Sequence, residues 1–384
     1  MKNKKKICIV VASRANYSSI KSVLKNIIDS DKLELQLILC ASALNDKFGN
    51  IGDLIKNDRI KVNQKLDFLH TGNTPESMVK TTSLGMIELS NAFKNLKPDL
   101  VLTVGDRYET MATVIAAAYM NIPIAHTMGG EISGSIDESI RHAITKFSHI
   151  HFPATLKSYK RIIKLGEKKS SVFLTGCPRI DLIDEVNIHS FNKNLFKSGV
   201  GEEIDIDKKF LLVSFHAVTT EFGLAEIQMN KILSVIKSFD LQSIVLWPNA
   251  DAGTDDIAKS IRKFREKGLD KKMHFFKNIP VNDYIFLMKK TSCLVGNSSS
   301  GIREGSFIGT PVVNIGSRQN DREKGGNVIT VELEENLIKK SISKQINRGF
   351  YKRSTLYGSG DAGIKITKIL EDLEKISVQK RLTY

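Results

Sequence analysis

The stretch that decides the fold class is KICIVVA at residues 6–12, followed by SSIKSVLKNIID at residues 18–29. The first segment is an unbroken apolar run rich in β-branched residues, which is typical of a strand buried on both faces. A buried strand followed by an amphipathic helix is the start of a βαβ unit, so the sequence predicts an α/β protein with a parallel sheet. The helical spacing is carried by Ile20, Val23, Leu24, Ile27 and Ile28.

The alternation of strand and helix continues to residue 165. A polar, weakly periodic stretch at 184–209 then interrupts the pattern, and we place the connection between two domains there. In the first series, strands are predicted at 33–41, 99–104, 122–127 and 149–154, and helices at 108–120, 136–147 and 155–165.

A second series begins at residue 210. We therefore expect two doubly wound parallel-sheet domains, residues 1–184 and 185–362, with a ligand cleft between them at the carboxyl ends of the strands. The apolar runs of this series predict strands at 210–215, 243–247, 273–277, 293–296 and 311–315, and helices at 225–238, 254–266, 281–290 and 363–376.

Composition and charge narrow the function classes. The 384 residues are 41% hydrophobic and 26% charged, which is typical of a globular protein. The net charge is +15, but the lysines are spread along the chain and no nucleic-acid-binding motif occurs, so a small anionic ligand fits better than a nucleic acid. No apolar run approaches the roughly 20 residues that span a bilayer, and the run after MKNKKK is short for a signal peptide. We expect a cytoplasmic protein without a membrane partner.

Cofactor and metal motifs are not found. The turn after the first strand is SRANYS at 13–18 rather than G-x-G-x-x-G, and no Walker A sequence occurs, so we expect no dinucleotide or P-loop ATP site. His149 and His151 could form a metal pair on one strand face, but no third ligand has suggestive spacing, and we predict no metal. The cysteines form no C-x-x-C pair and are expected to be buried free thiols: Cys8, Cys40, Cys177 and Cys293.

The segment GNSSSGIREGSF at 296–307 is a candidate anion site. It follows a predicted strand and opens a predicted helix, its glycines allow close approach of the backbone, and its serines offer hydroxyls and N–H groups to a diphosphate. Glu304, about one turn inside the helix, could accept hydrogen bonds from a ribose diol. A serine N-cap with Glu304 completing a capping box explains the same pattern equally well.

Charged residues follow two strands of the first domain. Arg14 and Ser18 lie four residues apart at a helix start and share one face, so Arg14 could hold a phosphate or could be a surface arginine. Asp106 and Arg107, in VGDRYE, end a buried strand where α/β active sites form, although an ion pair would suit the same place.

The densest cluster is HTMGGEISGSIDESIRHAITK at 126–146. Glu131 and Asp137 offer two carboxylates for acid–base chemistry, and Asp137 shares a helix face with Arg141. A capped helix with a surface ion pair is the alternative. In the second domain, FHAVTTE ends a strand, and its His216 could donate to a phosphate in the cleft or serve a structural role.

Taken together, these segments resemble the hydrolysing UDP-N-acetylglucosamine 2-epimerases. The resemblance covers nearly the whole chain, in the order SRANYS, GDRYE, GGEISGSIDESIRHAITK, FHAVTTE, WPNADAG, GNSSSGIRE, GSRQNDRE and YGSGDA. It implies two Rossmann-like domains of glycosyltransferase-B type, a C-terminal helix (363–384) that packs back on the first domain, and a homodimer or homotetramer.

The resemblance also implies a reaction. UDP-N-acetylglucosamine and water would give N-acetylmannosamine and UDP, without a metal or cofactor, for sialic or other nonulosonic acid biosynthesis. A proton is removed from C2, UDP is eliminated to leave a 2-acetamidoglucal, and water then adds with inverted configuration at C2.

Site residues follow from matching the family's motifs position by position. Within the substrate set, the backbone of Ile279 would contact uracil, two serines would hold the diphosphate and Glu304 would accept from the ribose. The catalytic candidates are Asp106, Glu131, Asp137 and His216. The substrate-binding candidates are Arg14, Ser18, Arg107, Arg141, His216, Asn249, Ile279, Ser298, Ser299, Glu304 and Arg318.

Three positions depart from the relatives. Relatives often carry a carboxylate at the position of Asn16, some have histidine at that of Val104, and several have a catalytic glutamate where this chain has Met128. If Met128 lines the sugar pocket, its apolar side chain would suit a 6-deoxy sugar, as in UDP-2,4-diacetamido-2,4,6-trideoxyglucose of the legionaminic acid pathway. The alternatives are therefore this diacetamido substrate, a non-hydrolysing epimerase, a glycosyltransferase, and a nucleotide-sugar-binding protein without catalysis.

Overall fold

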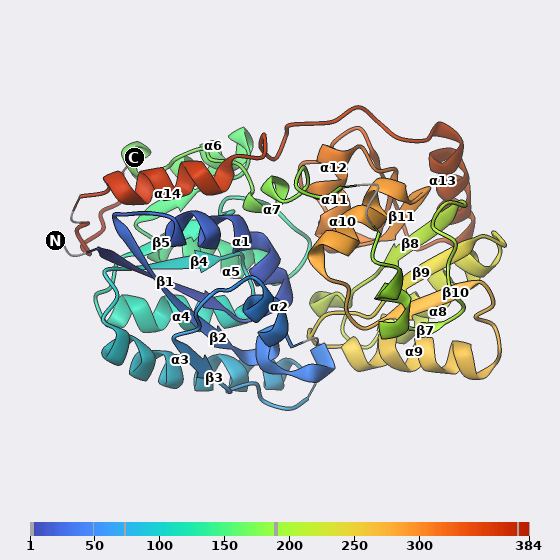
Figure 1. Ribbon diagram of the computed structural model, residues 1–384, viewed down its shortest axis with the longest axis horizontal. Helices are drawn as coiled ribbons and strands as arrows, with labels where there is room; N and C mark the ends of the chain where they lie inside the picture. The colour runs from blue at the N-terminus through green and yellow to red at the C-terminus, as the bar shows by residue number, and fades with distance from the viewer. Residues whose placement is uncertain (1–3, 49, 73, 188–190, 375, 384) are drawn as a thin grey trace.

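Two parallel sheets form two lobes that lie next to each other along the long axis of the molecule (Figure 1). The structure is a computed structural model that describes residues 4–48, 50–72, 74–187, 191–374 and 376–383. The first sheet has the order β3-β2-β1-β4-β5-β6 and is parallel throughout. Its strands are β1 (Lys5–Val11), β2 (Leu33–Cys40), β3 (Gln64–Leu66), β4 (Leu100–Val104), β5 (Ile124–Thr127) and β6 (Ile150–Phe152).

The second sheet has the order β13-β12-β11-β8-β9-β10-β7. Its pairs are parallel except that β7 runs antiparallel to β10 at one edge. Strand order that runs outward in both directions from a central strand confirms the predicted doubly wound α/β class. The strands are β7 (Val200–Gly201), β8 (Phe210–Ser214), β9 (Gln242–Leu246), β10 (Met273–Phe276), β11 (Cys293–Gly296), β12 (Val312–Ile315) and β13 (Val328–Val331).

Helices connect the strands in both lobes. In the first lobe they are α1 (Arg14–Ile28), α2 (Gly52–Asn57), α3 (Pro75–Leu96), α4 (Tyr108–Tyr119), α5 (Asp137–Phe147), α6 (Leu156–Lys164) and α7 (Pro178–Asp181). Those that follow are α8 (Ala225–Lys237), α9 (Thr254–Glu266), α10 (Val281–Lys290), α11 (Ser299–Ile302), α12 (Glu304–Ile308), α13 (Glu335–Arg348) and α14 (Ala362–Asp372). Short 3-10 helices lie at Ala41–Leu44, Asp46–Phe48, Lys169–Ser171, Lys193–Ser198, Thr219–Glu221 and Ser317–Gln319.

Strand β1 shows why its run is apolar without alternation. Ile7, Ile9 and Val11 enter a core that also contains side chains of α1 and α14, whereas Cys8 and Val10 enter a second core with side chains of α3 and α4. Both faces of the strand are therefore removed from water, and every position along it gains from an apolar side chain.

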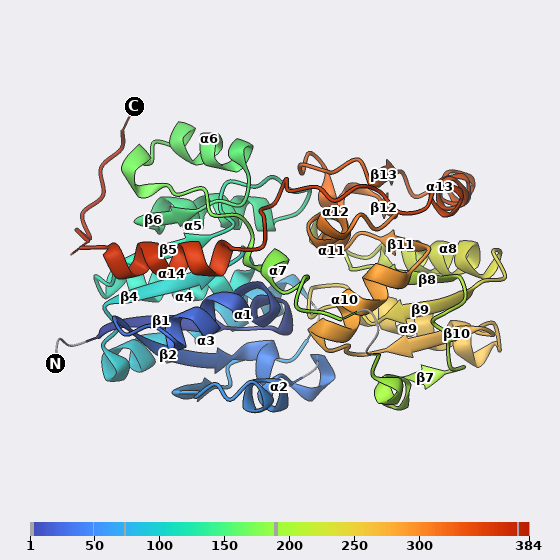
Figure 2. The ribbon, with the colours of Figure 1, turned by 45° about the horizontal axis from the view of Figure 1, so that its top comes forward.

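Helix α14 returns to the first lobe after the chain has completed the second. It lies against α1, as Figures 1 and 2 both show. The Asp181 carboxylate accepts hydrogen bonds from the N–H groups of Ala362 (3.1 Å) and Gly363 (2.7 Å). These two bonds satisfy backbone donors at the start of α14 that have no partner within the helix.

Several elements differ from the sequence-based expectation. Helix α1 begins four residues early, at Arg14, because the Ser13 hydroxyl accepts from the Asn16 N–H at 3.2 Å and caps it there. The last helix ends at Asp372 rather than at residue 376. Helices α2, α3 and α13 and the strands β3, β7 and β13 were not predicted from the sequence. These three strands are short and partly or fully exposed.

No helix within the described ranges combines the length and the apolar character needed to cross a bilayer.

Candidate active site

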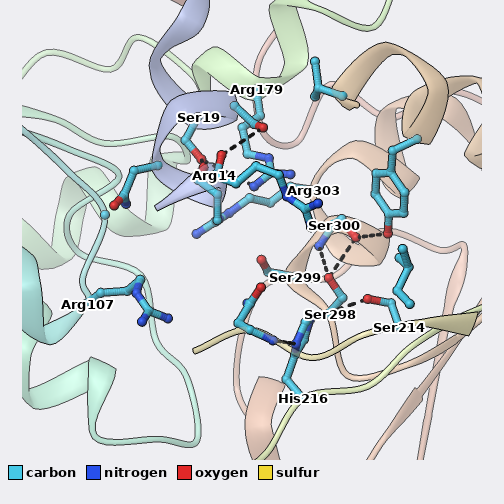
Figure 3. Close-up of a pocket in the computed structure, with 18 of the residues that line it drawn as sticks. Arg14, Ser19, Arg107, Arg179, Ser214, His216, Ser298, Ser299, Ser300 and Arg303 are labelled. Carbon is cyan, nitrogen blue, oxygen red and sulfur yellow. Dashed lines mark hydrogen bonds between the residues drawn. The ribbon is translucent and has the colours of Figure 1, made fainter. Parts of the chain in front are cut away.

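A cleft lies where the carboxyl ends of the strands in the two sheets face each other. Its first-lobe wall comes from the loops after β1, β4 and β5, with Arg14, Arg107 and Asp137 among the residues that line it. Its second-lobe wall comes from the loops after β8 and β11, with His216 and Ser298 (Figure 3). The topology thus brings together residues that are nearly 300 positions apart in the chain.

Arginines from both lobes line this cleft, and most of them are already paired. Arg107 holds Glu109 through two nitrogens (3.0 Å each) and Asp251 of the other lobe at 2.6 Å. Arg179 is paired with Glu304 at 2.6 Å. Arg14 differs, because its Nη1 is buried without a hydrogen-bond partner among the described residues.

Arg14 is the cleft cation best suited to an incoming anion. Burial lowers the pKa of its guanidinium to about 10, which leaves the group charged at neutral pH. A buried, charged donor without a partner is costly, and a phosphate oxygen would satisfy it. In Figure 3, Arg14, Arg179 and Arg303 lie together opposite the serines that follow β11.

The serine loop is shaped by a glycine that no other residue could replace without strain. Gly296 has φ +139°, and a Cβ there would lie 2.0 Å from the backbone oxygen of Ser214. The loop then presents linked hydroxyls: Ser298 Oγ and Ser300 Oγ are 2.9 Å apart, and Ser300 Oγ is 2.7 Å from the Tyr284 hydroxyl. Such hydroxyls can donate to phosphate oxygens.

The helix expected after this loop is broken. Arg303 separates α11 from α12, so Glu304 is the first residue of α12 rather than one turn inside a continuous helix. Its carboxylate does not close a capping box, because Arg179 holds one oxygen. The other oxygen is buried without a hydrogen-bond partner in the part of the chain that the structure describes. Glu304 therefore lies behind the cleft wall, oriented by Arg179.

His216 is positioned as a neutral hydrogen-bond donor. Its Nδ1 accepts from the Asn249 N–H at 3.2 Å, which leaves the proton on Nε2. Burial and then Arg318 lower the pKa of His216 to about 3, so the ring is uncharged at neutral pH. In this form His216 Nε2 lies 3.5 Å from Ser214 Oγ, and it can donate to a ligand in the cleft in place of this long contact.

The two carboxylates that line the cleft have opposite protonation behaviour. Burial raises the pKa of Asp106, but Arg141, Arg322 and Arg303 outweigh it and hold the pKa well below its ordinary value. For Asp137, burial followed by Asp106 and Asp251 outweighs the opposing charges of Arg318 and Arg107 and raises its pKa from 3.8 to about 6. Two carboxylates whose pKa values are pushed apart are typical of acid–base sites. Asp106 stays ionised, while Asp137 can exchange a proton near neutral pH.

Glu131, predicted as a catalytic candidate, lies below the cleft surface. It is 3% exposed, and its Oε2 is 2.7 Å from Arg303 Nη2 and 3.5 Å from Arg322 Nη1. Burial opposes its ionisation, but these arginines outweigh that effect and lower the pKa of Glu131. Glu131 thus holds Arg303 in the cleft wall through Oε2, whereas its Oε1 is buried without a hydrogen-bond partner among the described residues.

Arg141, predicted as a substrate contact, is completely buried. It donates to Asp106 at 2.8 Å, to the Glu131 carbonyl at 2.8 Å and to Ser133 Oγ at 3.0 Å. It therefore fixes the Asp106 carboxylate from behind rather than facing a ligand, because its donors are all turned toward the protein.

The cleft brings together most of the predicted residues. Glu131, Arg141 and Glu304 are the ones behind its wall. The predicted residues on the wall are Arg14, Ser18, Asp106, Arg107, Asp137, His216, Asn249, Ile279, Ser298, Ser299 and Arg318.

Several residues that line the cleft were not predicted from the sequence. Arg303 stands inside the quoted serine loop, where a cation next to glycines and serines was a usable signal. Tyr284 lies on α10, Trp247 follows β9, and Arg179 lies in the four-residue helix α7. No sequence motif around these three residues indicates a binding site.

Met128, which stands where several relatives have a catalytic glutamate, lies on the cleft wall. It has φ +60° and is 3% exposed, and its sulfur is 3.5 Å from the Cys177 sulfur. The wall is therefore apolar at this point.

The histidine pair has structural partners. His151 Nε2 is 3.1 Å from Glu167, and His149 Nδ1 accepts from the Ile124 N–H at 3.1 Å. Among the residues described, no group of three or more histidine, cysteine, aspartate or glutamate side chains is placed to hold a metal ion.

The fold and the cleft together define the class: an α/β protein of glycosyltransferase-B architecture, with its ligand site between two Rossmann-like lobes. The chain belongs to the UDP-N-acetylglucosamine 2-epimerase family, whose model matches residues 25–371. The resemblance drawn from the motifs is thereby confirmed.

Curated relatives match almost end to end. The chain is 32% identical to UDP-N,N'-diacetylbacillosamine 2-epimerase (hydrolyzing) of Legionella pneumophila, over 96% of each protein. It is 33% identical to GDP/UDP-N,N'-diacetylbacillosamine 2-epimerase (hydrolyzing) of Campylobacter jejuni, over 87% of this chain and 86% of the relative. Among solved structures, UDP-GlcNAc 2-epimerase of Neisseria meningitidis bound to UDP-GlcNAc superposes with a TM-score of 0.79 at 18% identity, covering 95% of this chain and 99% of that one. At this identity the likeness establishes the fold alone.

Proposed function

We propose that the protein is a hydrolysing 2-epimerase that converts UDP-N-acetylglucosamine and water to N-acetylmannosamine and UDP. The observation that carries the proposal is the contrast between two carboxylates of one cleft: Asp106 is held ionised, whereas the pKa of Asp137 is shifted toward neutral pH. In the same cleft, Arg14 Nη1 is buried without a hydrogen-bond partner among the described residues. Epimerisation by elimination needs a group that moves protons next to groups that stabilise a leaving diphosphate.

The residues divide into these two tasks. Arg14 and the Ser298–Ser300 hydroxyls would hold the diphosphate and stabilise its charge as the bond from C1 to oxygen breaks. Asp137 lies on the wall where a proton would be removed from C2 or returned to it, and the ionised Asp106 beside it helps to raise the pKa of Asp137. The names of the two curated relatives, both hydrolysing 2-epimerases, support the same reaction class.

A second candidate substrate is favoured by Met128. The same chemistry on UDP-N,N'-diacetylbacillosamine, a 2,4-diacetamido-2,4,6-trideoxy sugar, would match an apolar wall to a methyl group in place of a hydroxymethyl group. This is also the substrate in the names of both relatives.

Proton NMR of the purified protein with each UDP-sugar, without added metal, tests the proposal. We expect free N-acetylmannosamine and UDP from UDP-N-acetylglucosamine. UDP-N-acetylmannosamine as product would instead establish a non-hydrolysing epimerase. Turnover of the diacetamido sugar alone would establish the second candidate, and UDP binding without turnover of either sugar would leave a binding protein.

Replacing Arg14 with Gln should weaken UDP binding. The substitution removes a charge-assisted hydrogen bond, so the Kd for UDP should rise about 10- to 100-fold by titration calorimetry. Lys25→Gln, on the exposed side of the same helix, is the matched control and should leave the Kd unchanged. An unchanged Kd in Arg14→Gln would show that this arginine does not meet the diphosphate.

A further inference from the structure

A second, smaller hollow opens from the cleft between the lobes, and we refer to it as the polar recess. Every side chain that lines it is polar. Asp106, Asp137 and Arg303 border both the recess and the cleft, whereas Ser133 and Gln319 belong to the recess alone. The lobes are in direct contact here, since the Gly134 N–H donates to the Arg318 carbonyl at 3.1 Å.

Two residues of the recess carry buried polar atoms with no hydrogen-bond partner within the described part of the chain. Gln319 is 2% exposed; its amide nitrogen donates to the Asn297 carbonyl at 2.8 Å, but its Oε1 has no donor. Arg303 donates from Nη2 to Glu131 at 2.7 Å, but its Nε–H has no acceptor. Buried polar groups are nearly always hydrogen-bonded. Two residues that line the same hollow thus leave one acceptor and one donor unsatisfied, and a small molecule that both donates and accepts would satisfy them after a small rotation of the side chains.

Asp137 connects this hollow to the chemistry. Its carboxylate accepts from Ser135 Oγ at 3.2 Å, and it borders both spaces. A molecule in the recess would therefore face the sugar in the cleft and could at the same time give a proton to Asp137.

We infer that the polar recess is the binding site of the reacting water, with Gln319 and Arg303 as the residues that position it and Asp137 as the group that takes its proton. The inference rests on the proposed function. After elimination, C2 of the 2-acetamidoglucal takes one proton from solvent, which replaces the proton that the elimination released, and C1 becomes electrophilic. The water oxygen then forms a bond to C1, and one water proton passes to the Asp137 carboxylate. The product has gained the elements of one water molecule, and no oxidant or reductant is needed.

This site also separates two halves of the reaction. Removal of the C2 proton and departure of UDP need no water, whereas hydration needs water held at C1. A recess that positions the water poorly should therefore allow the glucal to leave before it is hydrated. The measured quantity that reports on the site is the ratio of released 2-acetamidoglucal to free N-acetylmannosamine.

Gln319→Met is the variant that tests the inference, because it keeps the length of the side chain and removes the Oε1 acceptor. We expect the ratio of glucal to N-acetylmannosamine to rise about tenfold, the effect of losing one hydrogen bond, while the rate of UDP release stays within about threefold of the wild type. Gln319→Leu carries the same test if the Met variant does not fold.

Gln319→Glu is the matched control. It keeps an oxygen acceptor but loses the amide donor to Asn297, so it should retain the wild-type ratio. If the Met and Glu variants shift the ratio equally, the bond to Asn297 matters and the inference is wrong. An unchanged ratio in Gln319→Met, with or without slower UDP release, overturns it as well. Failure of the proposed function would be visible earlier, because the wild type would then release no free sugar.

Discussion

Replacing Asp137 with Asn is expected to remove turnover and, at neutral pH, to stabilise the fold. General acid–base catalysis contributes 10²- to 10⁴-fold, so kcat should fall by about a thousandfold. The pKa of Asp137 is raised to about 6, and its carboxylate form is the one that accepts a proton. The wild-type rate should therefore increase with pH up to about 6 and then level off, and the Asn variant should lose this dependence.

The gain in stability follows from the direction of the pKa shift. The folded state binds the Asp137 proton more tightly than the unfolded chain, where the pKa is 3.8. The stability that this proton contributes is fully present below pH 3.8 and is lost as the pH rises through 6. Two pKa units correspond to about 3 kcal/mol, and solvent screening at this partly exposed side chain reduces the expected gain of the Asn variant at pH 7.5 to about 1–2 kcal/mol.

Urea unfolding at pH 4 and pH 7.5 measures this difference. Asp137→Asn should match the wild type at the lower pH and exceed it at the higher one. Asp372→Asn, whose carboxylate is 61% exposed beside Lys32, should change neither activity nor stability. A loss of stability at pH 7.5 in Asp137→Asn would show that the carboxylate has a favourable partner.

Replacing Glu131 with Ala should destabilise the protein by about 3–5 kcal/mol, the cost of breaking a buried ion pair by removing one partner. Arg303 and Arg322 would both remain buried without their counter-charge, because Glu131 contacts both. Glu131→Gln should cost less, since an amide oxygen still accepts hydrogen bonds. Because the pKa of Glu131 is lowered in the folded state, its contribution is present above pH 4.5 and declines on acidification.

The free energies of unfolding of Glu131→Ala and Glu226→Gln, measured by equilibrium unfolding, show whether burial or ion pairing alone determines the loss of stability. Glu226 also contacts two cations, Lys259 and Lys263, at 2.9 and 2.7 Å, but on the surface. Its replacement should leave the unfolding free energy unchanged. Equal effects of the two substitutions would contradict the view that the buried position of Glu131 makes its ion pairs matter.

The sequence predicted the strands of both sheets better than the surroundings of the site. Strand β1 could be recognised because five consecutive apolar residues, at positions 7–11, are typical of a strand that is buried on both faces. Helix α3 received no prediction, although Thr74 caps it and Pro75 occupies its first turn, both of which are helix-start signals. Residues in strand-end loops, such as Asp106 and His216, were found because parallel strands end at a common edge.

The sequence by itself determined the α/β class, the family and the segments that reach the cleft, since hydrophobic periodicity and ordered motifs are local properties of the chain. Only the tertiary structure decided which carboxylate can move a proton. Glu131 and Asp137 look alike in the sequence, six residues apart. Glu131 forms ion pairs with two arginines from the second lobe, whereas at Asp137 burial and two neighbouring carboxylates outweigh the arginines. A pKa depends on the charges and the solvent within a few ångströms, and those neighbours come from distant parts of the chain, as Arg322 does for Glu131.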